Sequence, residues 1–270
     1  MIDCGEGTQQ QMRKFKARMS KLHSIFISHL HGDHVFGLPG LLATLSLQGR
    51  KGDLNIYAHK DVELLLAPIY KIYGNQLSYQ INIIPLNNNG FQTLFENNTI
   101  RISTFPLKHR IPTNGFLFEE KQAPRHMKGD MIQFYNIPFN EIKAIKSGDD
   151  FVTAEGKVIK NELLTTPSAP PRKYAYCSDT AYLPDMTAHI MNADVLYHEA
   201  TFAESELARA KKTRHSTAGQ AAEIAKMANV KKLIIGHFSS RYDDPDLLLR
   251  EAKAVFSNTE AAYEGKIIEL

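Results

Sequence analysis

Short apolar runs alternate with segments of helical periodicity along most of the chain. Apolar runs of strand length occur at 21–28, 54–58, 80–85, 99–107, 115–119, 173–177, 193–197 and 232–235. Apolar residues recur at helical spacing in the segments 37–47, 61–73 and 216–228. Strands that alternate with helices in this way predict the α/β fold class.

The region of about 120–160 interrupts this pattern. It loses clear periodicity and becomes charged, and Lys-Gly, Ser-Gly-Asp-Asp and Glu-Gly breakers mark turns within it. We interpret it as a partly extended arm inserted into a single domain of residues 1–270. The alternative is a long surface loop, and loops of this length in compact domains are usually functional or disordered.

Composition narrows the class of protein. With 270 residues, 43% hydrophobic and 23% charged, the chain can bury a sizeable core and has no bias towards disorder. A net charge of +3 is too small to demand a polyanionic partner. Cys4 and Cys177, both in runs that predict buried strands, cannot form a disulfide framework, which favours a reducing cytoplasm. The longest apolar stretch, 36–47, is too short to span a bilayer, so no membrane partner is expected.

Four potential metal ligands lie within six residues directly after the first predicted strand. They are His29, His31, Asp33 and His34, in the sequence HLHGDH. Imidazole and carboxylate groups together suit zinc or another borderline divalent ion. His29 and His31 alternate along an extended segment and can therefore point to one side, while the next turn offers Asp33 and His34 to a second ion.

Three later strand ends supply the ligands that such a site still lacks. His109, Asp179 and His237 each follow a predicted strand. We expect one ion to take His29, His31 and His109. The other would take Asp33, His34 and His237, with Asp179 bridging the two.

Several motifs relate the chain to a known family. HLHGDH resembles the HxHxDH signature of the metallo-β-lactamase superfamily. Five further motifs resemble those of ribonuclease Z, the tRNA 3′-processing endonuclease, and span nearly the whole chain: DCGEGTQ at 3–9, SDT at 178–180, HEAT at 198–201, HST at 215–217 and GHFSSRY at 236–242. The resemblance implies a metallo-β-lactamase fold, two Zn²⁺ ions per subunit with Mn²⁺ as an alternative, and a cytoplasmic homodimer.

The same resemblance implies the activity. A ribonuclease Z removes the 3′ trailer from precursor tRNA and leaves a 3′-hydroxyl on the tRNA. Phosphodiester hydrolysis needs an activated water, neutralisation of phosphate charge and a proton for the leaving oxygen. The resemblance pairs Glu199 with His215 as an oriented acid, and Asp33, a neighbour of the attacking water, is the expected proton acceptor.

Two features depart from the family pattern. The arm reads YNIPFNEIKAIKSGDD where a Gly-Pro-rich tip is usual, although Lys143 and Lys146 could contact RNA phosphates. Only Met1 and Ile2 precede DCGEGTQ, so the first strands of the fold are expected to be lacking, and adding them is expected to raise the melting temperature. A small-molecule hydrolase or phosphodiesterase on the same fold is the main alternative function, and a catalytically silent RNA-binding module is a third.

Overall fold

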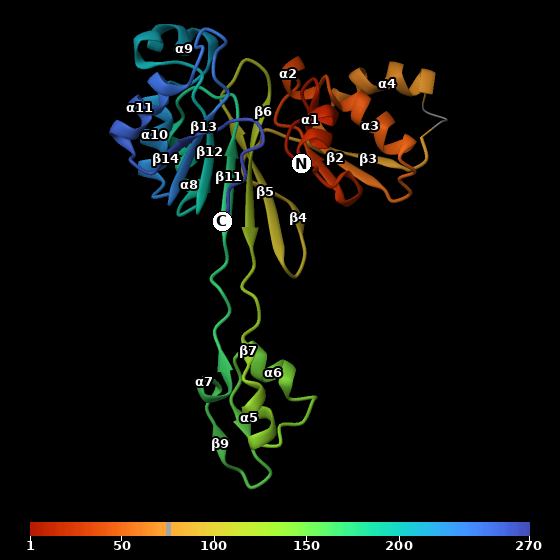
Figure 1. The fold of residues 1–270 in the computed structure, drawn as a ribbon, viewed down its shortest axis with the longest axis vertical. Coiled ribbons are helices and arrows are strands. Elements are labelled where there is room, and N and C mark those ends of the chain that lie inside the picture. The colour runs from red at the N-terminus through yellow and green to blue at the C-terminus, as the bar shows by residue number, and fades with distance from the viewer. Residues whose placement is uncertain (74–76) are drawn as a thin grey trace. The chain divides into compact units, whose positions relative to one another are not determined.

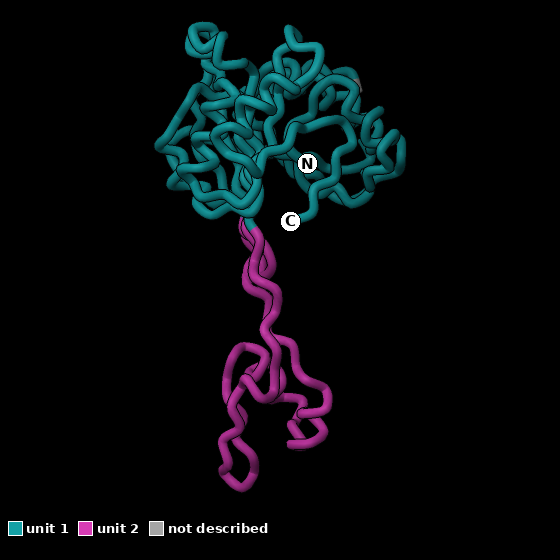
Figure 2. Tube along the Cα trace, turned by 60° about the vertical axis from the view of Figure 1, so that its left-hand side comes forward, with its two compact units in different colours: residues 1–94, 102–118, 173–270 teal, residues 95–101, 119–172 magenta. Residues whose placement is uncertain are grey.

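The computed structural model describes residues 1–73 and 77–270. The chain forms two compact units (Figure 2). Unit 1 comprises residues 1–94, 102–118 and 173–270, and unit 2 comprises residues 95–101 and 119–172. All predicted metal ligands belong to unit 1.

A parallel three-stranded sheet carries the first part of unit 1. It consists of β1 (Ser24–Phe26), β2 (Leu54–His59) and β3 (Ile81–Leu86) in that order (Figure 1). Two helices, α3 (Leu38–Leu47) and α4 (Val62–Tyr73), pack against it. Their apolar faces meet the sheet in one cluster, in which Leu41 and Leu66 are fully buried with Ile25 and Ile56. Burial of such side chains contributes about 1.5–3 kcal/mol each.

A seven-stranded sheet carries the rest of unit 1. Its order is β14-β13-β12-β11-β6-β5-β4. The strands are β4 (Gln92–Glu96), β5 (Ile100–Leu107), β6 (Thr113–Glu120), β11 (Lys173–Cys177), β12 (Val195–Glu199), β13 (Lys232–Gly236) and β14 (Thr259–Ala261). Strands β11 to β14 are parallel. Their carboxyl ends therefore lie at one edge, where parallel sheets commonly place functional groups.

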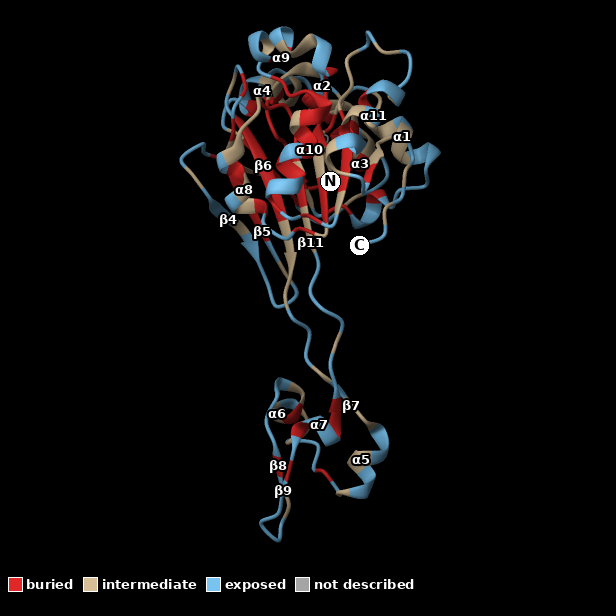
Figure 3. Ribbon diagram, turned by 90° about the vertical axis from the view of Figure 1, so that its left-hand side faces the viewer, coloured by how far each residue is buried: buried red, intermediate tan, exposed pale blue. Residues whose placement is uncertain are grey.

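Helices cover this sheet with small side chains. The helices are α8 (Thr187–Ile190), α10 (Ala218–Met227) and α11 (Asp246–Val255). Ala221, Ala222 and Ala225 of α10 are fully buried in the same cluster as Leu196 and Leu233, and the buried strands are visible in Figure 3. Helix α10 begins with a capping box, in which Thr217 and Gln220 exchange side-chain to backbone hydrogen bonds. Such a cap stabilises a helix by about 1 kcal/mol.

Short elements complete unit 1. They are α1 (Thr8–Lys14), η1 (Met19–Lys21), α2 (Gly32–Val35), η3 (Pro184–Met186), η4 (Glu204–Glu206) and α9 (Leu207–Thr213). Within the described ranges, no helix is both long and apolar enough to cross a bilayer.

Unit 2 is a small folded body with its own core. It contains β7 (His126–Met127), α5 (Gly129–Phe134), α6 (Ile142–Ser147), β8 (Phe151–Val152), β9 (Val158–Ile159), α7 (Asn161–Leu164) and β10 (Thr165–Thr166). Strands β7 and β10 pair antiparallel, as do β8 and β9. The buried core residues are Ile137, Ile145, Phe151, Ile159 and Leu164.

Polar contacts hold unit 2 together at two places. The buried amide of Asn161 donates to the backbone oxygens of Ile145 and Asp149 at 2.6 and 2.7 Å and accepts from the Thr165 hydroxyl at 2.8 Å. Where the chain enters and leaves the unit, the backbone N–H of Glu120 donates to the Arg172 oxygen at 2.9 Å. The Arg172 guanidinium also donates to both carboxylate oxygens of Glu120.

The predicted fold class and most predicted elements are confirmed. The segment 173–177 is β11, and the segments 54–58 and 232–235 are β2 and β13 without their last residues. Two expectations need correction. Cys177 is buried in β11, but Cys4 is buried outside any strand. The region of about 120–160 has no helix or strand at 121–125 and then folds into short helices and strands, in which four of its apolar side chains form a core with Leu164, so the expected loss of regular structure holds only for part of it.

Candidate metal centre and catalytic pair

The HLHGDH segment changes from extended chain to helix between its second ligand, His31, and its third, Asp33. Strand β1 ends just before it, His31 has extended backbone angles (φ −67°, ψ 151°), and α2 starts at Gly32. His29 and His31 therefore lie on the extended part, whereas Asp33 and His34 lie on the first helical turn. A Cβ atom at Gly32 would come within 2.3 Å of the exposed Phe36 ring, which would have to move to make room for it.

The first predicted ligand group converges on one point. His29 Nε2 lies 3.0 Å from His31 Nδ1, which lies 3.3 Å from His109 Nε2. The Oδ2 atom of Asp179 is 3.6 Å from both His29 Nε2 and His109 Nε2. These four side chains form one group that could hold a metal ion.

The second predicted group converges beside the first. Asp33 Oδ2 lies 3.4 Å from His34 Nε2 and 3.5 Å from His237 Nε2. The other oxygen of Asp179, Oδ1, lies 3.4 Å from His34 Nε2 and 3.2 Å from His237 Nε2. Asp179 thus presents one carboxylate oxygen to each group, which is the arrangement of a bridging ligand.

The spacing and chemistry of these atoms fit divalent cations. Ligand atoms about 2.05 Å from a tetrahedral zinc ion lie about 3.3 Å from one another, and the observed separations are 3.0–3.6 Å. Among residues 1–73 and 77–270, His34 Nε2 is a buried nitrogen without a hydrogen-bond partner. A buried polar atom of this kind is costly unless something binds it. A cation between Asp33, His34 and His237 would satisfy it.

Protonation favours metal binding at the first group. Burial lowers the pKa of His29 to about 3 and lowers the pKa values of His31 and His109 below their ordinary value. These three imidazoles are therefore neutral near pH 7, and each has a lone pair available for a cation.

The second group concentrates charge. Burial alone would lower the pKa of His34, but the Asp179, Asp3 and Asp33 carboxylates around its ring raise it to about 12. The adjacent His237 and His34 rings hold the pKa of Asp33 well below its ordinary value. Burial alone would raise the pKa of Asp179, but the neighbouring rings of His34, His237 and His29 outweigh burial and lower it. Both carboxylates are therefore ionised near pH 7.

The ring nitrogens that face away from the two groups have partners of their own. His29 Nδ1 lies 3.0 Å from Ser28 Oγ, and His34 Nδ1 lies 2.8 Å from Asp3 Oδ2. His109 Nδ1 lies 2.9 Å from the Arg214 backbone oxygen, and His237 Nδ1 lies 2.9 Å from Thr201 Oγ1. Such contacts fix ring orientation and tautomer in metal sites.

Glu199 and His215 form a buried pair next to the metal ligands. His215 Nδ1 lies 2.8 Å from Glu199 Oε1 and 4.0 Å from Asp179 Oδ2. Glu199 is fully buried and also accepts hydrogen bonds from the Thr180 backbone N–H, the Thr201 backbone N–H and the Thr201 hydroxyl. Because Glu199 engages Nδ1, the free ring nitrogen of His215 is Nε2. Asp179, His215 and His237 lie close enough to form a third candidate metal group.

Comparisons with known proteins decide the family. The chain is 52% identical over all its 270 residues to ribonuclease Z of Bacteroides fragilis, covering 89% of that protein, and 51% identical to ribonuclease Z of Bacteroides thetaiotaomicron, covering 85% of it. The chain belongs to the ribonuclease Z family. Members of this family are metal-dependent hydrolases of RNA phosphodiester bonds, and membership implies a dinuclear metal site.

Solved structures agree on the fold. The short form of human tRNase Z matches with a TM-score of 0.68 and 25% identity over 99% of this chain and 86% of that one. The metallo-β-lactamase fold protein YhfI from Bacillus subtilis matches with a TM-score of 0.68 and 20% identity, covering 99% of this chain and 86% of that one. Residues 1–132 also match the family model of the anti-Pycsar protein Apyc1.

The structure gives supporting roles to residues that the sequence analysis did not single out. Asp3 contacts His34, and Thr201 contacts His237, His215 and Glu199. Arg214, which has a left-handed backbone (φ 58°), holds His109 by donating to its backbone oxygen at 2.6 Å. Asp3 and Thr201 lie inside the DCGEGTQ and HEAT motifs, so the motifs mark both residues. The sequence alone does not say which side chains they contact.

Proposed function

We propose that this chain is a zinc-dependent endoribonuclease that removes the 3′ trailer from precursor tRNA and leaves a 3′-hydroxyl on the tRNA. The observation that carries the proposal is the sharing of Asp179 between two ligand groups, with the Glu199–His215 pair beside them. Family membership supports the RNA substrate.

Each ligand group has a defined part in this proposal. His29, His31 and His109 would hold one ion, Asp33, His34 and His237 the other, and Asp179 both. When bound, two Zn²⁺ or Mn²⁺ ions supply Lewis acidity to the scissile phosphate and to the attacking water. Asp33 takes the proton of that water, because its side chain is 65% exposed on the open side of the site and is ionised near pH 7.

Glu199 and His215 complete the reaction. The water oxygen forms a bond to phosphorus and the bond between phosphorus and O3′ of the tRNA breaks, so the phosphate stays on the trailer. His215 donates a proton from Nε2 to the departing O3′, which becomes the 3′-hydroxyl. Glu199 holds the orientation of the imidazole through Nδ1.

A basic hollow next to His109 supports an RNA substrate. It has a volume of about 520 Å³, and Lys108, His109 and Arg110 are among its lining residues. Positive side chains at such a place attract and position a phosphate backbone without reading sequence. We assign this hollow to the nucleotides that flank the scissile bond.

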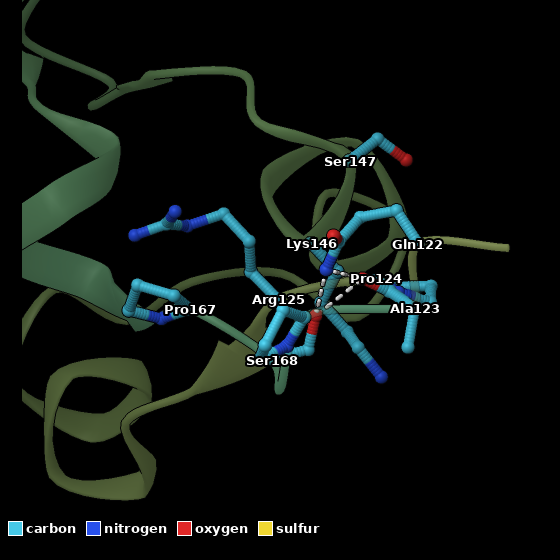
Figure 4. Close-up of a pocket in the computed structure, with 9 residues that line it drawn as sticks. Gln122, Ala123, Pro124, Arg125, Lys146, Ser147, Pro167 and Ser168 are labelled. Carbon is cyan, nitrogen blue, oxygen red and sulfur yellow. Dashed lines mark hydrogen bonds between the residues drawn. The ribbon is translucent and has the colours of Figure 1, made fainter. Parts of the chain in front are cut away.

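Unit 2 is the proposed tRNA-binding arm of a single enzyme domain. A hollow of about 590 Å³ in this unit is lined by Arg125 and Lys146 together with Gln122 and Ser168 (Figure 4). The described residues that line it include no carboxylate. Lys143 is exposed nearby on α6 and adds a further cation for phosphate contacts.

We also propose that the enzyme is a cytoplasmic homodimer. Leu47 on α3 and Leu64 on α4 are exposed apolar side chains that a partner subunit would cover. Light scattering of the purified protein tests it, and a monomer at micromolar concentration would contradict it.

The deciding experiment is cleavage of a precursor tRNA that carries a 3′ trailer, with added zinc or manganese. We expect one cut after the discriminator base in the wild type and no cut by Asp33→Ala. Hydrolysis of a small phosphodiester without cleavage of the precursor would refute the substrate and favour a small-molecule phosphodiesterase.

A further inference from the structure

Two tyrosines on neighbouring strands stack beneath the second ligand group. Tyr176 of β11 and Tyr197 of β12 are register partners in the parallel pair. Their ring centroids are 4.8 Å apart and their planes are inclined by only 11°. Both side chains are partly buried, and Tyr197 shares its face of β12 with Glu199, because alternate residues of a strand point to the same side.

The Tyr176 hydroxyl reaches the ligand His34 through one carboxylate. It donates to Asp3 Oδ2 at 3.0 Å, and the same oxygen lies 2.8 Å from His34 Nδ1. Asp3 has a left-handed backbone (φ 50°) and also accepts from the Ser28 N–H and hydroxyl at 2.7 and 2.9 Å. The Asp3 carboxylate is therefore held by Ser28, His34 and Tyr176. Among its described hydrogen bonds, only the one from Tyr176 comes from the seven-stranded sheet.

The Tyr197 hydroxyl reaches the ligand His237 through the backbone. A Cβ atom at Gly236 would lie 2.3 Å from Tyr197 Oη, so the phenol lies directly against the residue that precedes His237. His237 has a left-handed backbone (φ 58°), a strained conformation for a residue other than glycine that persists only when its surroundings hold it.

We propose that the Tyr176–Tyr197 stack is a positioning device that holds His34 and His237 at the correct separation for the second metal ion. The two rings form one rigid body, and each hydroxyl controls one ligand. Tyr176 reaches His34 through Asp3 alone, whereas it reaches His29 of the first group only through Asp3 and then Ser28 Oγ. The stack therefore acts more strongly on the second ion than on the first.

This inference rests on the proposed metal-dependent function and has its own readout. The full chain, stripped of metal by a chelator, is titrated with Co²⁺ against a competing chelator, and the visible spectrum reports each bound ion. We expect Tyr176→Phe, Tyr197→Phe and the double variant to weaken the second binding step by about 10–100-fold, as loss of a contact behind a metal ligand typically does. The first step should weaken less than the second.

Tyr174→Phe is the matched control. Tyr174 lies two residues before Tyr176 on β11, and the described structure shows no hydrogen bond from its hydroxyl. Phenylalanine keeps each ring, so metal-free melting temperatures should agree among all variants and the wild type. If one tyrosine variant has a lower metal-free melting temperature than the wild type, the other single variant is used for the test. This is possible because each variant removes one hydroxyl.

Three outcomes would overturn the inference: equal weakening of both binding steps, no weakening in the double variant, or the same weakening in Tyr174→Phe. The proposed function fails differently. A wild type that binds two ions but does not cleave precursor tRNA would refute the substrate and leave the role of the tyrosines standing.

Discussion

Replacing Glu199 with glutamine tests the buried pair with almost no change in shape. Glu199 Oε1 accepts from the Thr180 N–H and lies 2.8 Å from His215 Nδ1, while Oε2 accepts from the N–H and the hydroxyl of Thr201. Glutamine replaces one of these oxygens with an NH₂ group, which can only donate. Whichever oxygen is replaced, hydrogen-bond donors come to face donors.

The loss of stability in Glu199→Gln depends on which hydrogen-bonding groups around residue 199 can find another partner. If the NH₂ group faces Thr201, the hydroxyl turns to the His237 backbone oxygen 3.0 Å away, and only the Thr201 N–H is left unpaired. If it faces His215, the imidazole changes tautomer and only the Thr180 N–H is left unpaired. Either way one buried backbone N–H loses its partner, and we expect the free energy of unfolding to fall by about 1–3 kcal/mol.

Turnover should fall further than stability. Without the carboxylate, His215 loses the partner that orients its ring for proton donation, and general acid catalysis typically contributes about 10²–10⁴-fold. We therefore expect at least a 100-fold lower kcat on precursor tRNA at full metal content. Urea unfolding of the metal-free protein, metal analysis and single-turnover cleavage measure the three quantities.

Glu206→Gln is the control, because Glu206 is partly exposed on η4 and pairs only with Arg209 among its described ion pairs. Its stability should stay within about 0.5 kcal/mol of the wild type. Unchanged turnover in Glu199→Gln, or loss of metal from it, would refute the reasoning.

Three further predictions follow from the same structure. His215→Ala should keep both metals and lose about 10²–10⁴-fold in turnover, whereas His31→Ala should lose metal as well; equal metal loss in a metal analysis would contradict this. Because the pKa of His29 is lowered from 6.5 to about 3, mainly by burial, the metal-free fold loses stability as the pH falls below 6.5. The carboxylates around His34 overcome burial and raise its pKa to about 12, so the metal-free fold also loses stability as the pH rises above 6.5. Calorimetry with a chelator should therefore find the highest melting temperature near pH 6.5. A melting temperature that only rises or only falls between pH 5 and 9 would be inconsistent with these shifts. Asn161→Ala removes three hydrogen bonds and should destabilise unit 2 by about 3 kcal/mol, seen as faster hydrogen exchange in 119–172; equal acceleration throughout unit 1 would argue against a separate core.

The grouping of the metal ligands could be predicted because each ligand stands near the end of a strand. Asp179 and His237 follow β11 and β13, and these strands are parallel with β12 between them. Parallel strands bring their carboxyl ends to one edge, so residues far apart in sequence meet there. The strand pattern was enough to bring Asp179 and His237 together, whereas the HLHGDH ligands follow β1 of the other sheet.

The supporting contacts could not be predicted in the same way. Asp3 meets Tyr176 across 173 residues, and the stack of Tyr176 on Tyr197 depends on the register of two strands. Neither local periodicity nor residue type specifies a register. The core of unit 2 was missed for a related reason: Ile137, Ile145 and Phe151 lie in different short segments separated by turns, so no single helix or strand pattern links them.

The clamp between Glu120 and Arg172 has a consequence for how this enzyme family can diversify. Strands β6 and β11 are neighbours in the sheet, and the chain leaves one at Glu120 and enters the other at Lys173. The two ends of the insertion are thus already joined as a hairpin would join them, by backbone and guanidinium contacts. Segments of very different length and sequence can be exchanged at this junction while the catalytic half of the protein is inherited unchanged.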